Sequence, residues 1–275
     1  MDTRSKIILI SGPTASGKSN FALKVAEKIN GEIINTDSMQ VYKELSILTA
    51  RPSKKNQKKI KHHLYGFQTV TKNFSSGHWL KFAKLKIKEI KKRNNVPILV
   101  GGTGLYFKSL TDGLVKIPNI PIKFRNKIRY LQKKIGQKKF YDQLIKIDPI
   151  LKNKIDPNDV QRTIRAFEVK KFTKKSITKW FKKTRLSYKP SNFIKIYIDF
   201  PREQLNKRIK KRIDQMFVDG ALFEVKRFNK LKVSSDNSST RVIGIEEITK
   251  FLRNEQDLNE TKERIFIKTR QYAKR

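Results

Sequence analysis

The stretch GPTASGKS decides the fold of this chain, and its residues are Gly12, Pro13, Thr14, Ala15, Ser16, Gly17, Lys18 and Ser19. It has the spacing G-x-x-x-x-G-K-[ST] and lies between an apolar run, residues 6–10, and a segment with helical spacing, residues 19–29. A strand, a glycine-rich loop and a helix in this order predict a phosphate-binding loop. Backbone N–H groups and the helix N-terminus would surround phosphate oxygens, Lys18 would add a positive charge, and Ser19 would offer a hydroxyl to Mg2+.

Further strands and helices alternate after this loop. A short strand is expected at residues 32–35 and another at 96–100, with a helix over about 78–93 before the second one. Alternation of this kind predicts a parallel sheet flanked by helices, the α/β class. Residues 193–200 return to strand character, and helical segments follow to the end of the chain.

The middle of the chain differs from both ends. Apolar residues between 115 and 190 recur with the period of a helix, and no strand pattern is visible there. We therefore expect a core formed by residues 1–114 and 191–275, interrupted by an all-helical insertion domain at 115–190.

Polar residues follow two of the expected strands. Asp37 comes just after the strand at 32–35, and the GGTG stretch at 101–104 places Thr103 just after the strand at 96–100. Ligands of a parallel sheet bind at the carboxyl ends of its strands, so both residues are expected near the phosphate loop. Asp37 is the best candidate acid-base group, although a turn residue or a Mg2+ ligand remains open, and the GGTG stretch is either a ligand contact or a tight turn.

The charge of the chain limits the classes of partner that it is expected to bind. The sequence has 275 residues, with 64 Lys and Arg against 24 Asp and Glu, and a formal net charge of +40. Such an excess points to a polyanion, either nucleic acid or an anionic membrane surface, although biased lysine usage would raise the charge without any function. A hydrophobic fraction of 37% with 17 Phe is sufficient for a packed core.

Other classes are excluded by what the sequence does not contain. Zero Cys excludes a disulfide scaffold and a thiolate metal site. A stretch of about 18 apolar residues and a cleavable signal pattern are both missing, so we expect a soluble, cytoplasmic protein that does not bind membranes.

One helical face of the insertion has the side chains expected for RNA. Gln161, Arg162 and Arg165 lie one, three and four residues apart, which places Gln161 and Arg165 on the same face with Arg162 close by. Such a face can hydrogen-bond bases and phosphates, but a solvated charged face is an equally good interpretation.

The residues alone leave the ligand open. Kinases, ATP-hydrolysing enzymes and diphosphate-using transferases all need the same nucleotide- or diphosphate-binding loop. A small-molecule or nucleoside kinase fits the loop but explains the charge badly. A nucleic-acid-binding ATPase explains the charge, but the strand at 96–100 does not end in the Asp that would hold Mg2+ and water in such a protein.

A resemblance to a known family reduces these alternatives. The motifs match, in order and from end to end, those of tRNA dimethylallyltransferases: GPTASGKS, DSMQVY (37–42), TARP (49–52), HH (62–63), GGTGLY (101–106), NDVQRTIRAFEV (158–169), RIDQMFVDG (212–220), IGIEE (243–247) and TRQYAKR (269–275). The resemblance implies a P-loop kinase-like core with a helical insertion. It also implies transfer of a dimethylallyl group from dimethylallyl diphosphate to N6 of the adenosine 3′-adjacent to the anticodon, in tRNAs that read codons beginning with U.

The resemblance also implies roles for individual residues. Asp37 is the general base, Thr103 lies near the bridging oxygen of the leaving group, and Lys18 with Mg2+ near Ser19 receives the diphosphate charge, together with Arg202. The implied tRNA contacts are Asp37, Ser38, Met39, Gln40, Thr103, Arg125, Gln161, Arg162, Thr163, Ile164 and Arg165. We expect a monomer that recognises the anticodon stem-loop.

Overall fold

The computed structural model describes residues 5–182 and 184–274, and Arg275, the end of the TRQYAKR motif, lies outside them. Contacts divide the chain into two compact units. One is formed by Met1–Thr111 with Tyr188–Arg275, and the other by Asp112–Ser187. Among the described residues, no helix has both the length and the apolar character required to span a bilayer.

The first unit contains a five-stranded sheet in the described part of the chain, with the order β3-β2-β4-β1-β5 and every pairing parallel. The strands are β1 (Ile7–Ser11), β2 (Gly31–Asn35), β3 (His62–His63), β4 (Val96–Val100) and β5 (Phe193–Tyr197). The predicted α/β class with a parallel sheet is confirmed.

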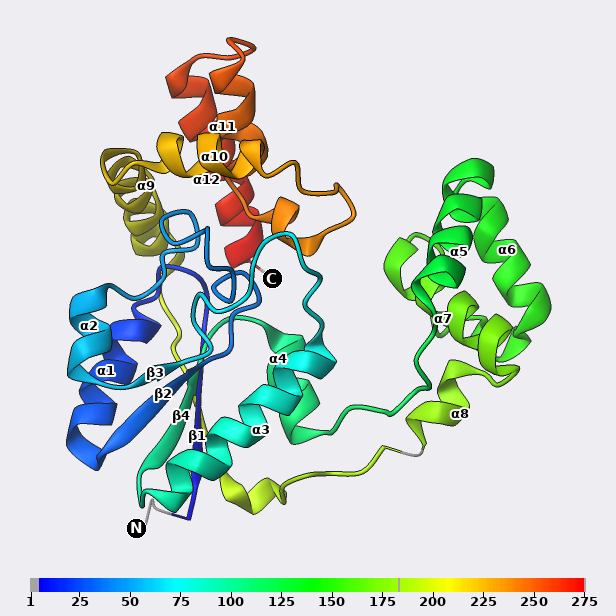
Figure 1. Ribbon diagram of the computed structural model, residues 1–275, viewed down its shortest axis with the longest axis horizontal. Helices are drawn as coiled ribbons and strands as arrows, with labels where there is room; N and C mark the ends of the chain where they lie inside the picture. Colours follow the sequence, from blue (N-terminus) through cyan, green and yellow to red (C-terminus); the bar gives the residue numbers. More distant parts are fainter. Residues whose placement is uncertain (1–4, 183, 275) are drawn as a thin grey trace. The chain divides into compact units, whose positions relative to one another are not determined.

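Helices cover both faces of this sheet (Figure 1), because successive side chains of a strand point to opposite sides. The α1 helix (Lys18–Ile29) packs Ala22, Leu23 and Ala26 against Ile8 and Ile10 of β1. On the other face lie α3 (Ser76–Lys92) and α4 (Gly104–Thr111). The remaining α-helices of the first unit are α2 (Lys54–Lys59), α9 (Arg202–Val218), α10 (Ala221–Lys230), α11 (Ile245–Leu252) and α12 (Leu258–Ala273).

The sheet differs from the sequence-based prediction in two places. The strand expected at residues 193–200 ends at Tyr197, where it loses its partner because β1 ends at Ser11. An edge strand, β3, was not predicted, since two residues give no periodicity. Its His63 ring nitrogen lies 2.6 Å from the buried carboxylate of Glu32 on β2, so His63 has a structural role here.

The second unit contains helices joined by loops and no strand among its described residues, and it has its own apolar core. Its α-helices are α5 (Ile122–Ile135), α6 (Gln137–Ile147), α7 (Val160–Thr173) and α8 (Ile177–Phe181). Phe140 and Phe167 lie at the centre of this core, with their ring centroids 4.7 Å apart.

Two strand ends approach each other closely at the carboxyl edge of the sheet. Gly101, the first residue after β4, lies against the backbone of Thr36, the first residue after β2. A Cβ at Gly101 would lie 2.2 Å from the carbonyl atoms of Thr36, far inside van der Waals contact. Only glycine therefore allows this spacing of the two loops.

We expect Gly101→Ala to lower the free energy of unfolding by about 1–3 kcal/mol, the cost of overpacking a tight site. Gly104→Ala is the matched control, because a Cβ at Gly104, the first residue of α4, meets nothing within 4 Å. Urea unfolding of both variants checks this. Equal midpoints for the two would show that the strand ends do not require close approach.

Candidate functional site

The phosphate-binding motif, residues 12–19, forms the loop after β1 and the first two residues of α1, as predicted. Gly12 permits the close approach of the backbone just after β5, since a Cβ there would lie 2.6 Å from the carbonyl oxygen of Ile198. Gly17 ends the loop with a φ of 91° and immediately precedes α1. The N-terminus of α1 therefore faces the same space as the loop, an arrangement that favours anions.

Lys18 and Ser16 give the loop its chemistry. The Lys18 amine donates a hydrogen bond to the carbonyl oxygen of Pro13 at 2.5 Å. Burial lowers the pKa of Lys18 to about 8; Asp37 raises that pKa and Arg212 lowers it further. Ser16 Oγ is buried and has no hydrogen-bond partner among the described residues. A phosphate oxygen would satisfy this hydroxyl, which is otherwise unfavourable to bury.

Asp37 follows β2 and is fixed by its own turn. Its backbone N–H donates to Asn35 Oδ1 at 2.8 Å, and Asn35 Nδ2 donates to the Asp37 carbonyl at 2.9 Å. The carboxylate accepts the N–H of Met39 at 2.8 Å. Burial raises the pKa of Asp37, although the hydrogen bond from Met39 and the charge of Lys18 oppose the shift. A carboxyl with a raised pKa is a stronger base once ionised.

Thr103 ties the loop after β4 to the turn at Asp37. Thr103 Oγ1 accepts the N–H of Ser38 at 2.9 Å and donates to Ser38 Oγ at 3.3 Å. Gln40 is held from another side, since its amide nitrogen donates to the carbonyl of Thr49 at 2.9 Å. The structure therefore brings together the residues predicted around Asp37 and the phosphate loop.

Two arginines of α9 contact the phosphate loop, and sequence reasoning gave neither a role. Arg212 donates to Thr14 Oγ1 at 2.9 Å, and Arg208 reaches the carbonyl of Ala15 at 3.5 Å. Their spacing of four residues, one helical turn, was the signal available in the sequence. Arg202, the predicted diphosphate ligand, is exposed in the first turn of α9 and is not among the residues that line the pocket. Its role stays a prediction.

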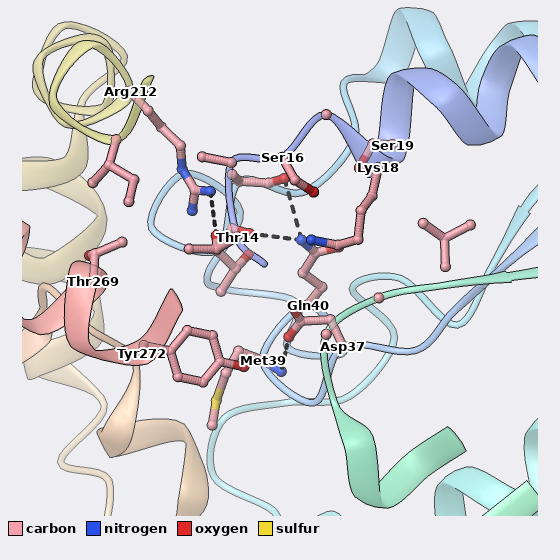
Figure 2. A pocket seen from close by; sticks show the side chains of 18 of the residues that line it. Thr14, Ser16, Lys18, Ser19, Asp37, Met39, Gln40, Arg212, Thr269 and Tyr272 are labelled. Carbon is pink, nitrogen blue, oxygen red and sulfur yellow. Dashed lines mark hydrogen bonds between the residues drawn. The ribbon is translucent and has the colours of Figure 1, made fainter. Parts of the chain in front are cut away.

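Residues of the phosphate loop, of the turn after β2 and of α9 line a cavity of about 1260 Å³ that lies within the first unit. Figure 2 shows Lys18, Asp37 and Arg212 around it, with Thr269 and Tyr272 of α12 on a further side. Sequence reasoning assigned no role to these last two. The cavity also has an apolar wall, formed by Met39, Leu48, Ile209, Ile213, Met216, Val242, Ile243 and Ile265. One side thus suits an anion and another suits a hydrocarbon group.

The residues present fit a Mg2+ ion that arrives with a phosphate compound. No group of three or more His, Cys, Asp or Glu able to hold a metal occurs among residues 5–182 and 184–274. The cavity does hold the Ser19 hydroxyl and the Asp37 carboxylate, with the unpaired Ser16 Oγ in the same loop. Mg2+ is commonly held this way, by few protein oxygens together with phosphates and water.

The predicted tRNA contacts in the second unit divide into exposed and buried residues. Gln161 and Arg162 are exposed at the start of α7, and Arg165 is half-buried. Thr163 and Ile164 face the interior, where the Thr163 hydroxyl donates to the Asp159 carbonyl at 2.7 Å. Arg125 on α5 contacts Glu168 of α7. The role of all six in binding tRNA stays a prediction.

A protein-family model and individual proteins both match the sequence of this chain. The model of the family described as IPP transferase matches residues 40–275. The tRNA dimethylallyltransferase of Pelagibacter ubique is 59% identical over 275 residues, which are 100% of this chain and 88% of that protein. The tRNA dimethylallyltransferase of Bartonella henselae is 43% identical, over 98% of this chain and 92% of that protein.

Solved structures are similar as well. A eukaryotic dimethylallyltransferase, described as acting on tRNA, matches with a TM-score of 0.84 and 31% identity, over 98% of this chain and 68% of that one. The tRNA isopentenylpyrophosphate transferase of Bacillus halodurans matches with a TM-score of 0.67 and 31% identity, over 98% of this chain and 84% of that one.

The lowered pKa of Lys18 predicts how anion binding depends on pH. The amine is charged below pH 8 and loses its charge as the pH rises through about 8. Bound inorganic diphosphate stabilises the charged form, so its affinity should fall about tenfold per pH unit above pH 8 until the pKa of the complex is reached. Isothermal titration calorimetry from pH 6.5 to 9.5 measures this.

Lys18→Arg is the matched control for the titration of diphosphate itself, because an arginine stays charged over this range. The ratio of the wild-type affinity to that of Lys18→Arg should be constant below pH 8 and fall above it. A ratio that does not change with pH would contradict the assignment.

Proposed function

The chain belongs to the IPP transferase family, and from that premise we propose that it transfers a dimethylallyl group from dimethylallyl diphosphate to N6 of the adenosine 3′-adjacent to the anticodon of tRNA. The observation that carries the proposal is the division of the cavity between an anion-binding side and an apolar wall. A diphosphate ester with a short branched hydrocarbon chain has the same division.

The leaving group needs electrostatic help. As the bond between C1 of the dimethylallyl group and the bridging oxygen breaks, its electron pair moves onto the diphosphate. The amides of the phosphate loop and the charge of Lys18 are arranged to receive it, and Arg212 lies beside the same loop. Mg2+ held by Ser19 and the diphosphate would neutralise further charge. Such preorganised groups act most strongly where water is excluded.

The nucleophile needs a base. The lone pair of adenine N6 is delocalised into the ring, so the new C–N bond forms more readily if the N6 proton is removed. Asp37 is suited to accept that proton, because its carboxylate lines the cavity and its turn is fixed by Asn35. The Thr103 hydroxyl donates a hydrogen bond to Ser38 Oγ, next to Asp37. It would have to rotate away from Ser38 Oγ before it could donate to the leaving oxygen.

The target adenosine must leave the stack of the anticodon loop to enter the cavity, at a cost of a few kcal/mol that contacts with the rest of the tRNA must offset. We assign these contacts to the residues at 37–40 and to α5 and α7 of the second unit. The net charge of +40 favours association with the tRNA backbone. We propose in addition that the enzyme acts as a monomer in the cytoplasm.

The proposal predicts that label from dimethylallyl diphosphate enters unmodified tRNA in the presence of Mg2+. Asp37→Asn should lower kcat by about 10²- to 10⁴-fold, the usual contribution of a general base. Thin-layer analysis of the digested tRNA measures both the rate and the modified nucleoside.

Asp199→Asn is the matched comparison, since Asp199 is another carboxylate that lines the cavity. Equal decreases in kcat for Asp37→Asn and Asp199→Asn would contradict the role of Asp37 as the general base. ATP turnover without tRNA, with no label transferred, would instead support the kinase alternative and sink the transferase proposal.

A further inference from the structure

One buried carboxylate of the second unit is surrounded by arginines. Glu168 lies on α7 with its side chain 1% exposed. Arg125 Nε lies 3.3 Å from Glu168 Oε2, Arg165 Nη1 lies 3.4 Å from the same oxygen, and Arg129 Nε lies 3.9 Å from Oε1. Two of these arginines belong to α5 and the third to α7, so Glu168 connects the two helices.

The charges of this cluster do not cancel. A buried carboxylate needs a cationic partner, and a single arginine is sufficient for that purpose. Three arginines around Glu168 leave a net charge of +2. Their side chains remain 36% (Arg125), 29% (Arg129) and 40% (Arg165) exposed, so none of the three is fully covered by protein although each has a nitrogen within 4 Å of the carboxylate.

A neighbouring arginine shows the contrast. Arg162 of the same helix is 75% exposed and pairs with Asp159 at 3.4 Å, and that carboxylate is itself 31% exposed. Such an exposed pair costs side-chain entropy and contributes little. The arginines on Glu168 are instead held by a carboxylate that cannot move into solvent, so less entropy is lost when they bind a further anion.

We propose that Glu168 is a positioning residue that holds Arg125, Arg129 and Arg165 in the orientation needed to bind phosphates of tRNA. The inference rests on the proposed function and extends it to Arg129 and Glu168. Planar guanidinium groups with free N–H donors bind phosphate oxygens in a fixed geometry. Phosphate contacts set the register of a protein on a nucleic acid, which is what delivery of one adenosine to the cavity demands.

The test is Glu168→Gln, for which the proposal and a purely electrostatic interpretation predict opposite changes in the affinity for tRNA. Removing a negative charge from a tRNA-binding surface should tighten binding if only net charge matters. Loss of the fixed orientation should weaken binding about tenfold. Filter binding of unmodified tRNA measures the dissociation constant, and steady-state rates should show a raised KM for tRNA with the KM for dimethylallyl diphosphate unchanged.

Asp142→Asn is the matched control, because it removes the same charge from an exposed position on α6 of the same unit. Binding by this variant should be equal to that of the wild type or slightly tighter. If Glu168→Gln behaves like Asp142→Asn, the positioning role is overturned.

Arg129→Gln keeps the test decisive if Glu168→Gln fails to fold. This half-buried residue can be replaced without burying a charge. The proposal predicts weaker tRNA binding, and the slope of the logarithm of affinity against the logarithm of salt concentration should become shallower by about one. Unchanged affinity and unchanged salt dependence would overturn the proposal, because the arginine cluster around Glu168 would then not bind phosphates as proposed.

Failure of this inference can be distinguished from failure of the proposed function. If the wild type transfers no label to tRNA, the proposed reaction fails whatever the variants do. If the wild type transfers label and Glu168→Gln binds tRNA as tightly as the wild type, the reaction stands and the positioning role fails.

Discussion

The site depends on how closely the backbone after β4 approaches the backbone after β2. Gly101 leaves no room for a side chain against Thr36, and the N–H of Thr103 donates to the Thr36 carbonyl at 3.1 Å. The Thr103 hydroxyl then reaches Ser38, the residue after Asp37. A wider gap between the strand ends would break both bonds and leave the turn at Asp37 free to move away from Lys18.

The same edge of the sheet sets the electrostatics of the cavity. Burial lowers the pKa values of Lys18 and Arg212, and the charge of Asp37 opposes both shifts, while Arg212 lowers the pKa of Lys18 further. Asp37 in turn has a raised pKa because of its burial. A bound diphosphate would stabilise the charged forms of Lys18 and Arg212. The pKa of Lys18 would therefore rise when diphosphate binds.

The sequence predicts the part of the site that depends on local geometry. The loop from Gly12 to Ser19 and the residues after β2 and β4 follow strand ends, and a parallel sheet brings strand ends together whatever the rest of the chain does. Arg208 and Arg212 come from a helix far away in the sequence, so only tertiary packing brings them to the loop. Burial of Thr163 and Ile164 depends likewise on how α7 packs. The two-residue strand β3 is too short for any periodic signal.

The few acidic residues of this basic chain matter because of where they lie. Glu32, Glu168 and Glu224 are all nearly inaccessible to solvent, and each organises groups from distant segments. Glu32 accepts hydrogen bonds from Arg93 and Asn95, and Glu224 accepts the N–H groups of Ser46, Ile47 and Leu48, beside the cavity wall. Surplus lysines can attract a polyanion from any direction, but they cannot orient it, because exposed flexible cations bind without fixed geometry. Orientation requires cations and amides that are themselves held in place. One buried carboxylate can hold several such groups while it lowers the net positive charge by only one.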